Sequence, residues 1–168
     1  RQVAKGDCTG YWSARTVLGS PDVEVAVLET ARGGILKRGL AFDRCDVGVV
    51  LNIAADHLGL DGVDTVEDLA QVKAVVATSS ARAVVLNAED PLCVAMGRRA
   101  KPEAEIVYFS MDPDHPVFLK HLEDGGRGVY LQDNAVVVAD GNLHQELVRV
   151  ESMPVAFGGR ARFNIANS

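Results

Sequence analysis

Two short valine-rich runs constrain the fold of this chain more than any other feature. They span residues 23–28 and 47–51. A short apolar run with many β-branched residues is typical of a strand buried on both faces, as in a parallel sheet. Each run stops at polar side chains, Glu29 after the first and residues 52–57, including His57, after the second. Because ligands bind beyond the carboxyl ends of parallel strands, the sequence predicts one shared site there.

The rest of the chain predicts alternating helices and strands. Thr65 to Asp68 resembles a capping box, Pro91 suits a first helical turn, and Gly39 suits a left-handed helix end. Helices are expected over residues 10–18, 30–38, 65–78 and 91–99, and further strands over 83–86 and 106–109. Such alternation indicates an α/β fold with a doubly wound, mostly parallel sheet.

The segment after about residue 125 has a different character. Three short strands are expected there, over residues 128–131, 135–139 and 143–150. Gln-Asp-Asn and Asp-Gly-Asn separate them, and both are hairpin signals. We therefore expect a small antiparallel β appendage at about residues 126–157, inserted in a single domain that covers residues 1–168.

Charge and composition argue against several function classes. The net charge is −6 and Lys and Arg form no large cluster, so neither nucleic acid nor an anionic membrane is an expected partner. No apolar run approaches the roughly 20 residues that span a bilayer. The three cysteines are odd in number and lack CxxC spacing, which predicts reduced thiols and a cytoplasmic location.

One lysine falls on the apolar face of the predicted helix 65–78. On a helical wheel with Val66 at 0°, Lys73 falls at about 340°, beside Leu69 at about 300°. Such a lysine either extends its amine to the surface along an apolar stem or serves chemistry, because burial lowers its pKa and makes the amine nucleophilic. His57 could likewise be an ordinary surface residue, and Glu29 an acid favoured at a helix start. The residues alone leave these alternatives open.

Residues 29–60 as a whole resemble the Mur-ligase-like module of the cyanophycin synthetase family. Residues 6–10, 84–91 and 108–113 are similar to the same family, so the resemblance covers nearly the whole chain. The broader Mur ligase and folylpolyglutamate synthetase superfamily shares a looser pattern: a strand-end Glu, Asn-x-x-x-Asp-His, a downstream Lys and Leu-Asn-Ala-x-Asp. The resemblance implies a fold of the Mur ligase central-domain type, here incomplete.

The same resemblance implies roles for named residues. Glu29 would help to hold the Mg²⁺ that bridges the ATP phosphates, and His57 would bind a second Mg²⁺. Lys73 would be carbamylated by carbon dioxide and so become a carboxylate beside that metal, which makes Lys73 and His57 the catalytic candidates. Asn164 and Asn167 resemble the superfamily's nucleotide-binding segment, in which the second asparagine contacts adenine.

The implied reaction is ATP-dependent amide formation. A carboxylate takes the γ-phosphoryl group to give an acyl phosphate, and an amine then displaces phosphate. In cyanophycin synthetases this module is expected to join arginine to the side-chain carboxylates of a poly-aspartate backbone. The resemblance thus implies ATP and Mg²⁺ as cofactors, arginine and the aspartate polymer as substrates, and a homo-oligomeric full-length enzyme.

The phosphate-binding loop that a Mur ligase needs is not in this sequence, since it contains no GxxxxGK[ST] and no GxGxxG. We therefore expect an interior piece of a longer ligase that is inactive by itself. Two alternatives stay open. One is a non-catalytic, doubly wound metal- or nucleotide-binding module such as a signalling receiver, and the other is a Mur-type ligase with a different amino-acid substrate.

Overall fold

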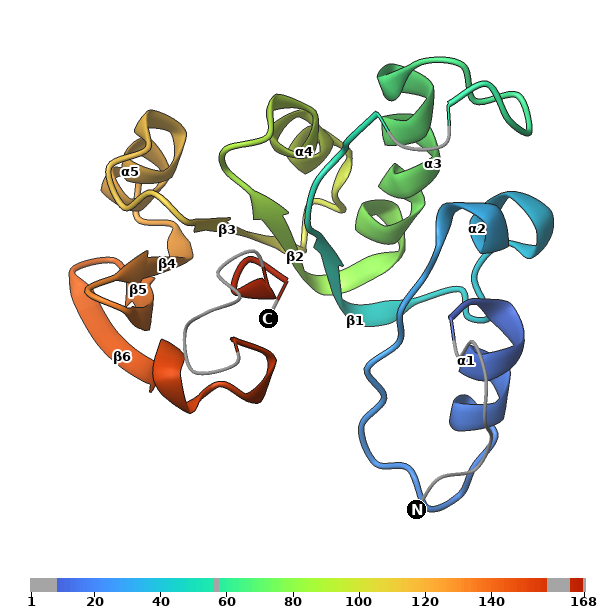
Figure 1. Ribbon diagram of the computed structural model, residues 1–168, viewed down its shortest axis with the longest axis horizontal. Helices are drawn as coiled ribbons and strands as arrows, with labels where there is room; N and C mark the ends of the chain where they lie inside the picture. Colours follow the sequence, from blue (N-terminus) through green and yellow to red (C-terminus); the bar gives the residue numbers. More distant parts are fainter. Residues whose placement is uncertain (1–8, 56–57, 157–163, 168) are drawn as a thin grey trace.

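The structure, a computed structural model, describes residues 9–55, 58–156 and 164–167, and the statements below concern these residues. Six strands form one sheet in the order β1-β2-β3-β4-β5-β6 (Figure 1). The strands are β1 (Cys45–Val50), β2 (Ser80–Asn87), β3 (Glu105–Ser110), β4 (Arg127–Gln132), β5 (Ala135–Asp140) and β6 (Leu143–Arg149). The helices are α1 (Tyr11–Leu18), α2 (Arg32–Arg38), α3 (Val66–Ser79), α4 (Pro91–Met96) and α5 (Pro116–Glu123), with 3-10 turns at Gly97–Arg99, Val150–Ser152 and Pro154–Ala156.

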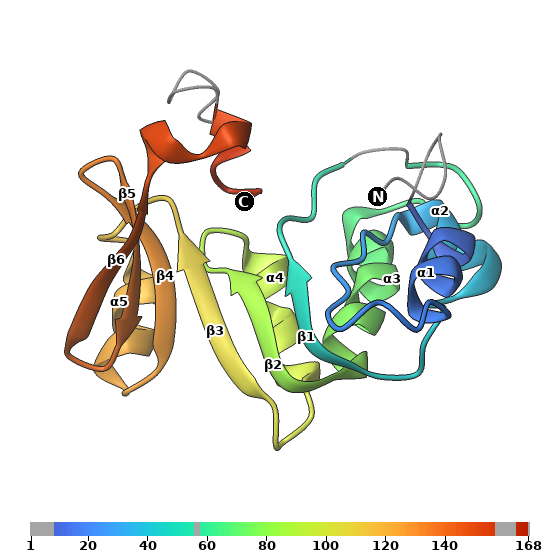
Figure 2. The ribbon, with the colours of Figure 1, turned by 90° about the horizontal axis from the view of Figure 1, so that it is seen from below.

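The sheet is parallel from β1 to β4 and antiparallel from β4 to β6. This confirms the expected α/β class, with a mostly parallel sheet and antiparallel strands near the C-terminus. Because β4 pairs in parallel with β3, with Val107 opposite Arg127, the hairpins continue the main sheet. Helices α3, α4 and α5 connect the parallel strands and lie on one face (Figures 1 and 2). Helix α5 is absent from the predicted elements. None of the described helices is long and apolar enough to cross a membrane.

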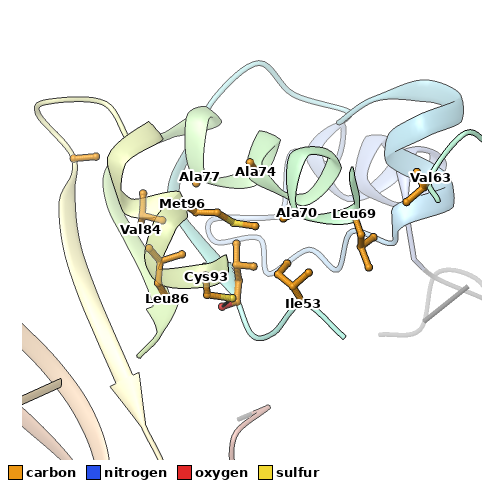
Figure 3. Close-up of a cluster of buried hydrophobic side chains, with 12 residues drawn as sticks. Ile53, Val63, Leu69, Ala70, Ala74, Ala77, Val84, Leu86, Cys93 and Met96 are labelled. Atoms are coloured by element: carbon orange, nitrogen blue, oxygen red, sulfur yellow. Dashed lines mark hydrogen bonds between the residues drawn. The ribbon is translucent and has the colours of Figure 1, made fainter. Parts of the chain in front are cut away.

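The main core lies between α3, α4 and the sheet (Figure 3). Three alanines of α3 face it, namely Ala70, Ala74 and Ala77. Their small side chains bring α3 close to the strands. At Gly48 of β1 this approach leaves no room, because an added Cβ would stand 2.1 Å from Ser80 Oγ.

The helix starts follow the predicted signals. Thr65 Oγ1 accepts the Asp68 N–H at 3.1 Å, and the Asp68 carboxylate accepts the Thr65 N–H at 3.0 Å, so the capping box is confirmed. Hydrogen bonds from the Thr65 hydroxyl and N–H lower the pKa of Asp68. Pro91 lies in the first turn of α4 as expected. Gly39 ends α2 with φ 70° and ψ −162°, so its φ is positive but the predicted left-handed helical conformation is wrong.

The predicted strand 23–28 is wrong. This segment has no strand pairing, and Val25 and Val27 are 83% and 96% exposed. Burial of β1 on both faces is also wrong, since Val47 and Val49 are about half exposed. Both differences have one physical cause. An apolar run becomes a two-face-buried strand only when partners pair with its edges and cover its faces, and within the described ranges β1 pairs with β2 alone.

Candidate functional site

The loop that leaves β1 is held by a side chain from α3. Lys73 donates a hydrogen bond from Nζ to the backbone carbonyl of Asn52, over 2.9 Å. Lys73 is partly buried, so its stem packs beside the α3 core while its amine reaches the carboxyl end of β1. The amine thus lies at the edge of the sheet where ligands of parallel sheets bind.

Asn87 and Asp90 hold the same loop from its other side. Asn87 ends β2 and donates from Nδ2 to the carbonyl of Leu51 over 2.9 Å. The carboxylate of Asp90 accepts the N–H of Ile53 at 2.6 Å. Sequence patterns alone assign no site role to either residue. The signal that could have found them is the Leu-Asn-Ala-x-Asp pattern within residues 84–91.

Glu89 links the loop after β2 to the loop after β3. Its Oε1 accepts the hydroxyl of Ser110 at 2.8 Å and the N–H of Asp112 at 3.2 Å, and it also accepts the N–H of Met111. The loops that follow β1, β2 and β3 are therefore joined into one layer by side chains of residues 87–90. This layer forms the carboxyl edge of the parallel sheet.

Arg32 ties the start of α2 to the far end of the loop after β1. Its guanidinium donates to the carbonyl of Leu60 and lies 3.8 Å from the carboxylate of Asp61. The Arg32 side chain is only 12% exposed, whereas that of Asp61 is 52% exposed, so the ion pair is open to water on the Asp61 side. Helix α2, which begins three residues after Glu29, packs against α3, the helix that carries Lys73.

The structure describes two of the three predicted metal ligands, Glu29 and Lys73. His57, with Asp56, lies outside the described residues, so its predicted role remains a prediction. Glu29 is exposed, and its backbone carbonyl accepts the N–H of Gly10 at 3.2 Å. Within the described ranges no three His, Cys, Asp or Glu side chains gather closely enough to hold a metal ion. Thus Glu29 is not shown to meet Lys73.

The chemistry of the described donors fits Mg²⁺ in part. Mg²⁺ prefers oxygen ligands and commonly uses one or two carboxylates together with substrate phosphates. Glu29 could supply one such carboxylate. Lys73 supplies an amine that donates a hydrogen bond, and only conversion to a carbamate would turn it into an oxygen ligand.

The two predicted nucleotide-binding asparagines lie in the C-terminal segment. Asn164 donates from Nδ2 to the carbonyl of Val155 over 2.9 Å, and Asn167 is exposed. Between them, Ile165 is buried against Val150. In Figure 2 this segment, drawn in red, lies beyond the arrowheads of β1 to β3. The structure therefore places it on the side of the sheet where the three linked loops lie.

Cys93 lies under the loop layer and is unsuited to act as a nucleophile. Its side chain is fully buried, with Sγ 3.8 Å from the carbonyl of Val50 (Figure 3). Burial, followed by the nearby charge of Asp90, raises the pKa of the Cys93 thiol to about 12. The thiol therefore stays protonated at neutral pH, and its role is packing.

A cavity of about 390 Å³ lies between the starts of α4 and α5. Its lining residues are Ala88, Glu89, Pro91, Val94, His115, Pro116 and Val117. None of the sequence-predicted site residues is among them. The cavity thus belongs to the loops after β2 and β3 and gives no support to the predicted site.

Known proteins include a family whose model matches most of this chain and several relatives that are nearly half identical to it. Residues 13–168 match the family model described as the Mur ligase middle domain. The chain is 49% identical to a cyanophycin synthetase of Synechocystis sp., and 46% identical to those of Crocosphaera subtropica and Geminocystis herdmanii. Each match covers 99% of this chain and 19% of the relative, so the chain spans about a fifth of the length of these curated relatives.

Proposed function

This chain belongs to the Mur ligase middle-domain family, and from that membership we propose that it forms part of an ATP-dependent amide ligase of the cyanophycin synthetase type. The observation that carries the proposal is the contact between Lys73 Nζ and the carbonyl of Asn52. It puts the lysine of the family pattern at the carboxyl end of β1, beside the loop that continues to Asp56 and His57.

The proposed reaction has two steps. A carboxylate oxygen of an aspartate side chain attacks the γ-phosphorus of ATP, ADP leaves, and an acyl phosphate forms. An amine nitrogen of arginine then attacks the acyl carbon, phosphate leaves, and the nitrogen loses a proton as the amide forms. The polymer of aspartate residues is the proposed acceptor, and the full-length enzyme is proposed to be a homo-oligomer.

The chain's own residues would prepare this edge for a triphosphate. We propose that Lys73, as the neutral amine, attacks carbon dioxide through Nζ, releases a proton and becomes a carbamate. With Glu29 and His57 it would then offer oxygen and nitrogen ligands for Mg²⁺, which when bound would neutralise charge on the phosphates. Asn164 and Asn167 are the proposed contacts for the adenine end of ATP.

The test uses the protein encoded by the complete reading frame that contains this chain. We expect arginine incorporation into a poly-aspartate acceptor that depends on ATP and Mg²⁺. Lys73→Met should lower kcat by about 10²–10³-fold, the typical loss when one transition-state charge contact is removed. Removal of bicarbonate and carbon dioxide should lower the activity of the unchanged protein and should leave that of Lys73→Met unaffected.

Lys120→Met is the matched control. Lys120 is 67% exposed in α5 and pairs with Asp124, the residue that follows this helix, so its loss should leave kcat within about twofold. Absence of ATP-dependent amide formation from every amino acid and polymer tried would refute the proposal. A Lys73→Met protein with unchanged kcat would refute the role of Lys73 but not the ligase assignment.

A ligase with another amino-acid substrate is the nearest alternative and would show amide formation with arginine replaced. A non-catalytic binding module would show metal or nucleotide binding with no amide product. For such a module Lys73→Ala would affect folding alone, because the lysine would then act only through its packed stem.

A further inference from the structure

We propose that Asn87 and Asp90 are positioning residues for the ligase reaction, acting through the loop that follows β1. They do not face the triphosphate in this proposal. Instead they fix the backbone on either side of Asn52, whose carbonyl receives the Lys73 amine. The inference rests on the proposed function for its catalytic meaning, whereas the geometry itself stands on the contacts below.

The contacts fall on three consecutive backbone positions. The carbonyl of residue 51 accepts from Asn87, the carbonyl of residue 52 accepts from Lys73, and the N–H of residue 53 donates to Asp90. The three bonds come from three different elements: Lys73 lies in α3, Asn87 ends β2 and Asp90 is the N-cap of α4. A backbone held at two successive peptide groups by three side chains has little freedom to shift relative to Lys73.

Each positioning residue also has a second, local bond made by its other polar atom. Asp90 uses Oδ1 to cap α4, accepting the N–H groups of Leu92 at 2.9 Å and Cys93 at 3.2 Å, and keeps Oδ2 for Ile53. Asn87 uses Oδ1 to accept the N–H of Glu89 at 2.9 Å and keeps Nδ2 for the β1 loop. Local structure and cross-loop contact are therefore carried by different atoms of one side chain.

Because the two bonds use different atoms, a substitution of equal volume can remove the bond to the loop after β1 and keep the local bond. Asp90→Asn retains an oxygen that can cap α4. The atom that faces the Ile53 N–H becomes an amide NH₂, which donates and cannot accept, so the bond to Ile53 is lost. Asn87→Asp retains the oxygen for the local turn, but places a carboxylate oxygen against the Leu51 carbonyl. Both changes preserve side-chain volume. Neither therefore creates a cavity that could lower stability for another reason.

The expected result is a loss of rate with the fold retained. In the protein from the complete reading frame, each substitution should lower kcat by about 10–100-fold, since a misplacement of about 1 Å at a reacting site can cost about 10²-fold. The KM for arginine should change by less than about threefold. The apparent Mg²⁺ requirement should rise, because the loop also carries Asp56 and His57.

Asp140→Asn is the matched control, because it makes the same exchange at an exposed carboxylate on β5, four strands away from β1 in the sheet order. The Asp140 carboxylate pairs with Arg127 at 3.1 Å and has no contact with the described residues of the loop after β1. Asp140→Asn should leave kcat, measured well below the Tm, within about twofold. A purely structural role for Asp90 would instead lower the Tm of Asp90→Asn and leave its kcat, measured well below that Tm, equally unchanged.

A second measurement needs no enzyme activity. In this chain the Ile53 amide should exchange slowly with solvent, because it donates to a carboxylate. Asp90→Asn should speed that exchange while the amides of residues 92 and 93 stay protected. Fast Ile53 exchange in the unchanged chain would overturn the geometry.

The two proposals fail in distinguishable ways. A protein with no ligase activity but a slow Ile53 amide would refute the proposed function, and the positioning role in catalysis with it. An active ligase whose kcat is unchanged in Asp90→Asn and Asn87→Asp would refute the positioning role alone.

Discussion

Replacement of Gly48 by alanine tests how tightly β1 is packed under α3. An alanine Cβ at this position would stand 2.1 Å from Ser80 Oγ and 2.8 Å from the backbone carbonyl oxygen of Val76. Heavy-atom contacts below 3.0 Å are not tolerated, so either Ser80 must rotate or α3 must move away from the sheet. The glycine is required here for close approach, since its φ is not positive.

The magnitude follows from what each response costs. Ser80 is fully buried, and its hydroxyl donates to the Val76 carbonyl over 2.8 Å. Rotating it would leave a buried hydroxyl without its acceptor, at about 1–3 kcal/mol. Displacing α3 adds an overpacking cost of about 1–3 kcal/mol. Because the Val76 contact remains after Ser80 rotates, both costs apply and Gly48→Ala should lose roughly 2–6 kcal/mol of unfolding free energy.

The assay is urea-induced unfolding of this chain followed by circular dichroism, with the Tm measured in parallel. A loss of roughly 2–6 kcal/mol should lower the Tm by roughly 4–24 °C for a chain of this size, at about 2–4 °C per kcal/mol. Gly33→Ala is the matched control. Gly33 lies within α2, and an added Cβ there meets nothing within 4 Å. Alanine should therefore stabilise the helix by up to about 1 kcal/mol.

The changes in unfolding free energy of the two variants together test whether α3 packs against β1 as described. Opposite signs for Gly48→Ala and Gly33→Ala are the expected result. A Gly48→Ala protein within about 0.5 kcal/mol of the unchanged chain would mean that α3 does not pack against β1 as described. The geometry that brings Lys73 to the end of β1 would then be wrong as well.

Two further predictions concern stability. The raised pKa of the Cys93 thiol, about 12 against an ordinary 9.0, means that above pH 9 the unfolded chain loses a proton that the folded chain keeps. Stability should therefore fall as the pH rises from about 9 to about 12, and less so in Cys93→Ala; equal pH slopes in urea titrations would contradict this. Phe118 is 1% exposed and packs on Tyr130, so Phe118→Ala should lower the free energy of unfolding by about 3–5 kcal/mol. Val117 is 37% exposed, so Val117→Ala should lower it by less than about 1 kcal/mol in the same urea titration.

Elements with explicit end signals were predictable from the sequence. The capping box at Thr65 and the proline at the start of α4 are interactions among neighbours within four residues, so the local sequence suffices to place them. The helical wheel of residues 65–78 likewise indicated that Lys73 lies beside buried residues. Helix α5 was not predicted, although it too begins with a proline, Pro116.

The candidate site was predictable only where a family pattern marked it. Lys73 was named and its amine lies at the end of β1, but Asn87 and Asp90 were not assigned roles. Their bonds join residues 36 and 37 positions apart in the chain. No periodicity or spacing reports a contact of that kind, since it exists only after β1 and β2 pair.

The sequence by itself determined the α/β class, the starts of α3 and α4 and the family of this chain, because periodicity, caps and motif spacing are local properties. Tertiary structure alone decided which valines are buried. The runs at 23–28 and 47–51 have similar compositions. Among the described residues, only the second pairs with another strand, β2, and has one face covered. Burial depends on what the rest of the molecule places beside a segment, and a segment's own composition does not contain that information.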